Sequence, residues 1–188
     1  MSRLKLFLVV SAASLLLGGC GGQRAHHGRG WDYQQAWGAI TNAVCVVRPT
    51  EGNRCFGVVR FTQTGRKVRV VADISGLSPN AQHAIHIHTY GDATSPDGKS
   101  AGGHYNPEEH AHGLPGQAAR HAGDLGNLVA NNNGTSHYEI VADNITIAGP
   151  HNPIIGRAII VHAKRDTGVQ PTGGAGARIA CGVIGIAH

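Results

Sequence analysis

The sequence has little that marks a protein as one that binds nucleic acid or spans a membrane. Its net charge is +5, but its lysines and arginines form no basic run, which argues against a nucleic-acid partner. The apolar run at residues 6–17 is too short to cross a bilayer comfortably. No internal repeat is evident, and no long stretch places apolar residues at the helical period. Long amphipathic helices are therefore not expected.

The first twenty residues resemble an export signal. Arg3 and Lys5 precede the apolar run, which ends in Gly18-Gly19-Cys20, similar to a bacterial lipoprotein box. This pattern predicts a signal peptide at 1–19, lipidation of Cys20, and a location on the periplasmic face of a bacterial membrane. Plain secretion with an unmodified Cys20 is the alternative. The polar residues that follow predict a flexible tether at 20–36, where the pair His26-His27 is expected to be solvated.

The rest of the chain, 37–188, is expected to form one all-β domain. Short runs rich in β-branched and aromatic residues alternate with turn signals, and the chain contains 28 glycines. This pattern favours an eight-stranded antiparallel sandwich or barrel. The expected strands are 44–47, 56–61, 68–74, 83–90, 126–129, 137–141, 158–162 and 178–184.

Two glycine-rich segments, 91–123 and 164–177, are too long for hairpin loops. Long loops in a compact domain are usually functional or disordered. The first contains four histidines, at positions 104, 110, 112 and 121. We therefore expect it to fold around a metal, because ligation can replace the core that such a loop lacks.

Thirteen histidines are an excess for 188 residues, and most of them lie between His83 and His162. In the predicted strand 83–90, alternation places His86 and His88 on one face and directs His83 away from them. His162 ends a second apolar strand and can complete a site with that pair. Imidazole is the commonest metal ligand in proteins, so these residues predict a metal centre.

The first long loop carries a second candidate set: His104, His112, His121 and Asp124. Three imidazoles and one carboxylate make a closed tetrahedral zinc set. The alternative is a solvated histidine-rich loop. His110 lies outside the set and is expected to be exposed.

Five motifs extend beyond the candidate ligands: HIHTYGD at 86–92, GGHYNP at 102–107, HAGDLGN at 121–127, IIGRAIIVH at 154–162 and GARIACGVIGIA at 176–187. Together they resemble the copper/zinc superoxide dismutases, and the resemblance extends over residues 39–188. The chain resembles an exported bacterial lipoprotein form with eukaryotic-type motifs at its glycine-rich end.

This resemblance implies an eight-stranded Greek-key barrel and dismutation of superoxide to oxygen and hydrogen peroxide. It implies that His104 bridges the metals as an imidazolate, that Asp166 orients His86 and His112, and that Arg178 binds and steers the substrate. The terminal segment 182–187 resembles a dimer-forming strand, so a homodimer is expected. The implied copper ligands are His86, His88, His104 and His162, and the implied zinc ligands are His104, His112, His121 and Asp124.

The chain departs from the family pattern in two places. The loop between His162 and Arg178 is short and lacks the family's cluster of acidic residues and lysines, although Lys164 and Arg165 remain nearby. The family's disulfide usually ties the metal loop to the last strand. Cys181 matches the strand partner, but the loop contains no cysteine, so its order is expected to depend on zinc.

The remaining cysteines leave the disulfide pairing open. If Cys20 is lipidated, one pair and one free thiol among Cys45, Cys55 and Cys181 is the simplest count. Cys45 matches a buried free cysteine of the eukaryotic-type members, and both Cys45–Cys55 and Cys55–Cys181 stay open as pairs.

Three other functions compete with a dismutase. A non-catalytic copper- or zinc-binding lipoprotein on the same scaffold is disfavoured because every ligand position is filled and Arg178 is present. A copper-only variant is disfavoured by the complete zinc set. A hydrolytic zinc enzyme needs an open zinc position and a general base, and the sequence suggests neither.

Overall fold

The computed structural model describes residues 33–188. The predicted signal peptide, the lipidation site Cys20 and most of the predicted tether lie outside the described residues. Residues 33–36, the last part of that tether, belong to the short helix α1 (Tyr33–Gly38). Within the described part of the chain, no helix is long and apolar enough to cross a membrane.

The eight predicted strands are all present, and most extend slightly beyond their expected ends. Strand boundaries are less certain from sequence than strand existence, because alternation fades where backbone pairing continues into a turn. The strands are β1 (Asn42–Pro49), β2 (Phe56–Thr64), β3 (Lys67–Ser75), β4 (Gln82–His88), β5 (Asp124–Val129), β6 (Ser136–Ala142), β7 (Ala158–His162) and β8 (Arg178–Ile186).

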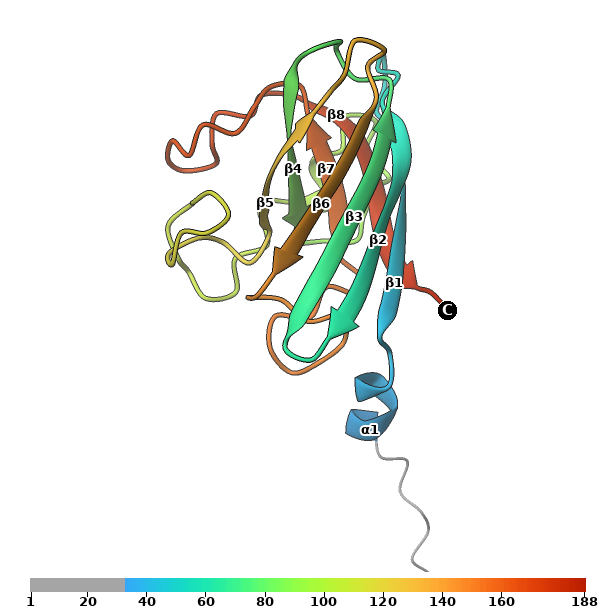
Figure 1. Ribbon diagram of the computed structural model, residues 1–188, viewed down its shortest axis with the longest axis vertical. Coiled ribbons are helices and arrows are strands. Elements are labelled where there is room, and N and C mark those ends of the chain that lie inside the picture. The colour runs from blue at the N-terminus through green and yellow to red at the C-terminus, as the bar shows by residue number, and fades with distance from the viewer. Residues whose placement is uncertain (1–32) are drawn as a thin grey trace, which may run out of the picture. The chain divides into compact units, whose positions relative to one another are not determined.

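The strands form one antiparallel Greek-key barrel (Figure 1). The order around it is β5-β4-β7-β8-β1-β2-β3-β6, so the β3–β6 and β1–β8 pairs join strands that are distant in sequence. The edge strands β5 and β6 meet where Tyr138 Oη donates a hydrogen bond to Leu125 O at 2.6 Å. The predicted fold class is confirmed.

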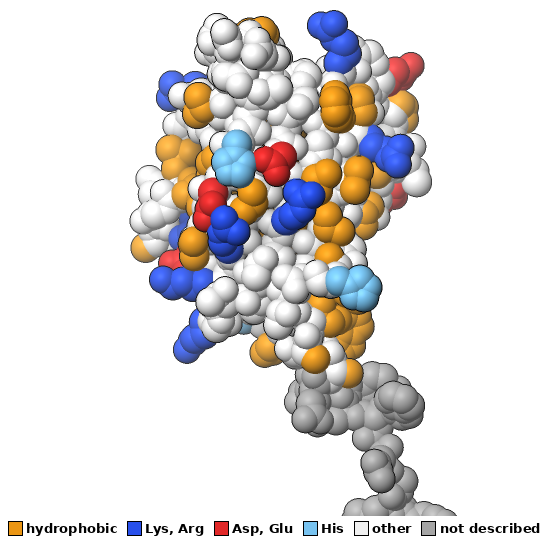
Figure 2. All heavy atoms as spheres, turned by 45° about the vertical axis from the view of Figure 1, so that its right-hand side comes forward, with side chains coloured by type: hydrophobic (Ala, Val, Ile, Leu, Met, Phe, Trp, Pro, Cys, Tyr) orange, Lys and Arg blue, Asp and Glu red, His pale blue; other side chains and the backbone are white. Residues whose placement is uncertain are grey.

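The barrel interior is packed with branched aliphatic side chains. Fully buried members come from both halves of the barrel and include Phe61, Ile85, Ile87, Leu125 and Ile159. Strand β3 alternates between buried and exposed residues, as expected for a strand with one face in the core. Its outer face carries ion pairs such as Arg69–Glu139 at 2.6 Å. Figure 2 shows one face of the molecule, where charged side chains of both signs lie among apolar ones.

Strand β4 is buried on both faces, as is its neighbour β7: all but the first residue of β4 are buried. One face of β4 packs in the core, and the other is covered by the long loops, which project on one side of the barrel (Figure 1). Main-chain hydrogen bonds attach the first loop to β4: Ile87 N–H donates to Gly123 O, and Tyr105 N–H donates to Ile87 O, both at 2.9 Å. A Cβ at Gly123 would overlap Ile87 O, so only glycine allows this approach.

The expectation of one disulfide among the three domain cysteines is wrong: Cys45, Cys55 and Cys181 are free and buried. Strand β1 separates β2 from β8, which keeps Cys55 and Cys181 off neighbouring strands. In the β1–β2 ladder Cys45 lies opposite Val59. Val59 is four residues after Cys55, which is about 13 Å along the strand. A disulfide needs Cα atoms within about 7 Å, so the sheet register prevents this pair.

Candidate metal centre

Two groups of buried potential metal ligands lie side by side and share His104. One consists of His86, His88, His104 and His162, and the other consists of His104, His112, His121 and Asp124. Within each group one donor atom per residue lies within 4.8 Å of the others. All seven residues predicted as ligands are therefore brought together.

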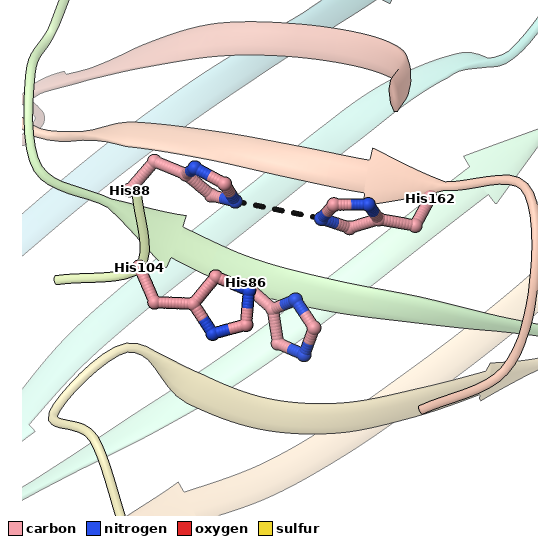
Figure 3. Close-up of side chains that lie close together, drawn as sticks. All are labelled: His86, His88, His104 and His162. Carbon is pink, nitrogen blue, oxygen red and sulfur yellow. Dashed lines mark hydrogen bonds between the residues drawn. The ribbon is translucent and has the colours of Figure 1, made fainter. Parts of the chain in front are cut away.

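The barrel places these residues through strand pairing. His86 and His88 come from β4 and His162 from the end of β7, while an isolated β-bridge joins His104 to His88 (Figure 3). Asp124 begins β5 directly opposite His86. A bulge between Ala84 and His86 changes the register of β4 at this point.

His88 and His162 face each other with the same ring nitrogen, Nε2. His88 Nδ1 donates a hydrogen bond to Gly102 O at 2.9 Å, and His162 Nδ1 donates to Gly176 O at 3.2 Å. Because a neutral imidazole carries one proton, both Nε2 atoms then hold lone pairs, and they lie 3.4 Å apart. Two lone pairs aimed at each other in a buried site repel unless a cation lies between them. The arrangement fits a metal ion.

Asp166 orients one histidine of each group. Its Oδ2 accepts a hydrogen bond from His86 Nε2 and its Oδ1 accepts one from His112 Nε2, each at 2.9 Å. These bonds leave His86 Nδ1 and His112 Nδ1 deprotonated, and both atoms are buried with no hydrogen-bond partner in the described structure. Buried polar atoms are rarely left unpaired. The polar atom beside His112 Nδ1 is Asp124 Oδ2 at 3.0 Å, which is another acceptor, so both nitrogens face positions that suit a cation.

The second group surrounds a buried carboxylate. Asp124 Oδ1 lies 2.9 Å from His104 Nδ1 and 3.2 Å from His121 Nδ1, and Asp124 Oδ2 accepts the N–H groups of Gly113 and His121. Burial raises the pKa of Asp124, but the hydrogen bonds from His104 and Gly113 outweigh it and hold the pKa below its usual value. The carboxylate is ionised and ready to bind a cation.

His86 and His162 of the first group stay neutral at ordinary pH. Burial lowers the pKa of His86 to about 4, against the opposing effect of its hydrogen bond to Asp166, and lowers that of His162 to about 3. A neutral ring keeps the lone pair that ligation needs. Four imidazoles suit copper, and three imidazoles with one carboxylate suit zinc, so the residues present fit both metals.

Arg178 lies beside the first group. Its Nη1 and Nη2 donate hydrogen bonds to Gly98 O and Gly102 O, both at 2.6 Å, and it forms no salt bridge with any described carboxylate. With His88, His104 and His162 it lines a cavity of about 160 Å³. Such a cavity admits a small anion beside a fixed positive charge.

Three residues of the site were not identified from the sequence. Thr172 lines the same small cavity. Asn127 holds the backbone of Asp166: its Oδ1 accepts the Asp166 N–H at 2.7 Å, and its Nδ2 donates to Asp166 O at 3.0 Å. His83 lies outside both groups, as parity predicted, but it is buried and donates from Nδ1 to His162 O at 2.8 Å. Strand parity could exclude His83 as a ligand, but it could not show this supporting contact.

Gly173 is a position where the site has no room for a side chain. Its φ is +77°, and a Cβ there would overlap Asp166 Oδ1 and crowd His112 Nε2. We expect Gly173→Ala to weaken zinc binding and lower the melting temperature, because the Asp166–His112 hydrogen bond must shift. Gly116→Ala is the matched control, since Gly116 has φ +91° and open space around it. The left-handed backbone alone costs about 1–2 kcal/mol, so equal losses in the two variants would contradict this prediction.

The first long loop is held without a disulfide. Ser95 and Ser100 exchange hydrogen bonds between their N–H and Oγ groups at 3.1 and 2.8 Å, and Arg178 binds the carbonyls of Gly98 and Gly102. We expect removal of zinc to accelerate proteolysis within residues 105–123 and thiol reductants to have no effect on it. Limited digestion of the metal-loaded and zinc-free protein measures this, and unchanged cleavage of the zinc-free loop would count against it.

Comparisons with known proteins agree with this geometry. The family model described as copper/zinc superoxide dismutase matches residues 55–184. A superoxide dismutase [Cu-Zn] of Paramecium bursaria Chlorella virus 1 is 44% identical over 156 residues, which cover 79% of this chain and 81% of the relative. One from Onchocerca volvulus is 42% identical over 78% of the chain and 96% of the relative. An extracellular superoxide dismutase [Cu-Zn] from Brugia pahangi is 39% identical over 77% of the chain and 75% of the relative.

Proposed function

The chain belongs to the copper/zinc superoxide dismutase family, and from that premise we infer which of its residues carry the reaction. It is an enzyme that converts superoxide into oxygen and hydrogen peroxide, with copper and zinc as cofactors. When bound, the copper supplies a reversible one-electron couple and the zinc a structural Lewis acid.

In the proposed assignment, copper is held by His86, His88, His104 and His162, and zinc by His104, His112, His121 and Asp124. The observation that carries this assignment is the pair of buried nitrogens, His86 Nδ1 and His112 Nδ1, that Asp166 leaves without partners. Each belongs to a different group, and His104 belongs to both. One carboxylate therefore orients a ligand of each metal.

His104 is the proposed proton carrier. Its Nδ1 faces Asp124 and His121, while its Nε2 has no hydrogen-bond partner in the described structure and its ring lies against that of His86, 4.1 Å between centroids. As an imidazolate it joins both groups. In one half-reaction its Nε2 takes up a proton, and in the other it passes that proton to the reduced oxygen species.

Arg178 is proposed to bind the substrate. Its guanidinium is held by two carbonyls and keeps its positive charge beside the small cavity, so it attracts and orients the superoxide anion. The same two bonds fix the loop that carries Gly98 and Gly102.

Selective loss of each metal tests the ligand assignment. His162→Ala is expected to lose copper and keep zinc, His121→Ala to lose zinc and keep copper, and His104→Ala to weaken both. Elemental analysis after dialysis, paired with a superoxide assay of the copper-loaded parent, measures this. Loss of zinc from His162→Ala with retention of copper would reverse the assignment. The alternative of a non-catalytic metal-binding protein is disfavoured by the named relatives and the filled ligand positions.

The proposed assembly is a homodimer formed through the outer face of β1 and β8. Val46 and Val183 lie on these paired strands and are 52% and 41% exposed, and Tyr90 beside them is 60% exposed. Gly91 borders Val183, since a Cβ there would lie 3.0 Å from Val183 Cγ1. An apolar surface of this kind is typical of an interface.

Sedimentation velocity tests the dimer. Val183→Glu is expected to convert a dimer into a monomer. Val141→Glu changes a valine on β6 that is 54% exposed, and it is expected to leave the dimer intact. A parent protein that sediments as a monomer would exclude the homodimer.

The proposed location is the periplasmic face of a bacterial membrane, with the lipid on Cys20, a signal peptide at 1–19, a tether at 20–36 and the catalytic domain at 37–188. The lipobox-like sequence before Cys20 supports export and anchoring. Cys20→Ser is expected to move the protein from the membrane fraction to a soluble one. Unchanged membrane association would exclude lipidation.

A further inference from the structure

Two surface histidines face one carboxylate outside the metal centre. Glu108 and His110 belong to the first long loop, and His151 belongs to the connection between β6 and β7. His110 Nδ1 lies 3.9 Å from Glu108 Oε2, and His151 Nε2 lies 3.9 Å from Glu108 Oε1. The carboxylate thus has one imidazole at each oxygen, from loops more than forty residues apart in sequence.

The backbones that carry the two imidazoles are fixed. Asn106 Oδ1 accepts the His110 N–H at 3.0 Å, and Asn106 Nδ2 donates to His110 O at 2.8 Å. His151 O accepts a hydrogen bond from Thr146 Oγ1 at 2.6 Å. Each ring makes one long hydrogen bond: His110 Nδ1 donates to Arg120 O at 3.3 Å, and His151 Nε2 accepts from Asn152 Nδ2 at 3.4 Å. The His110, His151 and Glu108 side chains are 45%, 57% and 37% exposed, so each ring can turn toward an ion once that bond is broken.

The separations do not correspond to direct hydrogen bonds, which end near 3.5 Å. Two imidazoles and one carboxylate are a common three-ligand set for zinc. Bonds of about 2.0–2.1 Å in a tetrahedron place donor atoms about 3.3 Å apart. The two imidazole–carboxylate distances of 3.9 Å must shorten, and the rings must also turn toward each other, because the three donor atoms do not all lie within 4.8 Å of one another. The nearby Arg120 is paired with Asp143 and brings no free positive charge to the carboxylate.

We propose that Glu108, His110 and His151 form a third, exposed metal site that takes a divalent first-row ion. The set binds Cu²⁺ more tightly than Zn²⁺, following the general order for nitrogen and oxygen ligands. An ion held there connects the zinc-binding loop to the β6–β7 connection. In a chain without a cystine in that loop, this link supplies a second restraint next to His112.

Calorimetric titration of Zn²⁺ into the copper- and zinc-loaded protein tests the site. His26→Ala and His27→Ala are introduced into every protein compared, so that the tether pair binds no ion. We expect one further Zn²⁺ per chain. His151→Ala and Glu108→Gln are each expected to weaken that event by more than about tenfold, because even indirect partners of ligands contribute 10–100-fold. His137→Ala, an exposed histidine paired with Asp73, is the control and is expected to retain it.

Hydrogen exchange measures the link between the loops. With free Zn²⁺ at about ten times the dissociation constant of the third event, exchange within residues 105–112 is expected to slow about tenfold in the parent and not in His151→Ala. Absence of a third event, a smaller loss of affinity in either variant, or unchanged exchange in the parent would overturn the proposal. Because the first two metals stay bound throughout, these outcomes leave their assignment untouched.

Discussion

An Asp166→Asn enzyme is expected to bind copper and zinc about 10- to 100-fold more weakly than the parent. The parent carboxylate accepts one N–H from His86 and one from His112. An asparagine keeps one acceptor oxygen, but its amide N–H₂ meets the N–H of the second ring. That ring must change tautomer, which places a proton on the Nδ1 that should bind the metal. Because Asp166 is buried, no water can replace the lost acceptor.

Competition with a chelator measures both affinities in Asp166→Asn. Asp143→Asn is the matched control. Asp143 is an exposed aspartate that pairs with Arg120 and belongs to neither ligand group. We expect the control to keep parental affinities. If both metals bound Asp166→Asn as tightly as the parent, Asp166 would have no role in orienting the ligands.

An Arg178→Ala enzyme is expected to lose roughly 10- to 1000-fold in kcat/KM at low ionic strength, the range that electrostatic focusing contributes. The loss follows because the fixed positive charge beside the cavity disappears, and the shortened loop lacks the family's acidic and lysine cluster. The rate should also become less sensitive to added salt. Fast kinetics with superoxide across a salt series, at equal copper and zinc content, measures both effects.

Arg178→Lys separates the charge from the hydrogen bonds. Lysine keeps the positive charge but cannot reproduce the fork that holds both Gly98 O and Gly102 O, so a partial recovery of rate is expected. Arg60→Ala removes an exposed charge from β2 and is the control. Full turnover by Arg178→Ala at low ionic strength would remove Arg178 from the mechanism.

Much of the fold was predictable because the barrel strands obey simple alternation. β-branched runs separated by turn signals located all eight strands, and strand parity grouped His86 with His88 and excluded His83. The resemblance of the motifs to a known family supplied the rest of the ligand set. The metal loop has no periodicity of its own, and only its histidines and Asp124 marked it as a site.

Contacts between distant segments were not predictable. The disulfide expectation failed because the sheet order and register, which no local pattern encodes, keep Cys55 away from Cys45 and Cys181. The hydrogen bonds of Asn127 to the Asp166 backbone join residues 39 positions apart. The proposed third site is similar, since no sequence pattern brings His151 to Glu108.

Residue types and their spacing were enough to identify the side chains that can bind copper or zinc. They could not show which nitrogen of each ring is free to do so, and the folded barrel settles that choice. An imidazole has one proton and two nitrogens, and the proton goes to the nitrogen that faces an acceptor. Those acceptors, Asp166 and the carbonyls of Gly102 and Gly176, come from other parts of the chain and reach the rings only when the barrel and its loops are assembled.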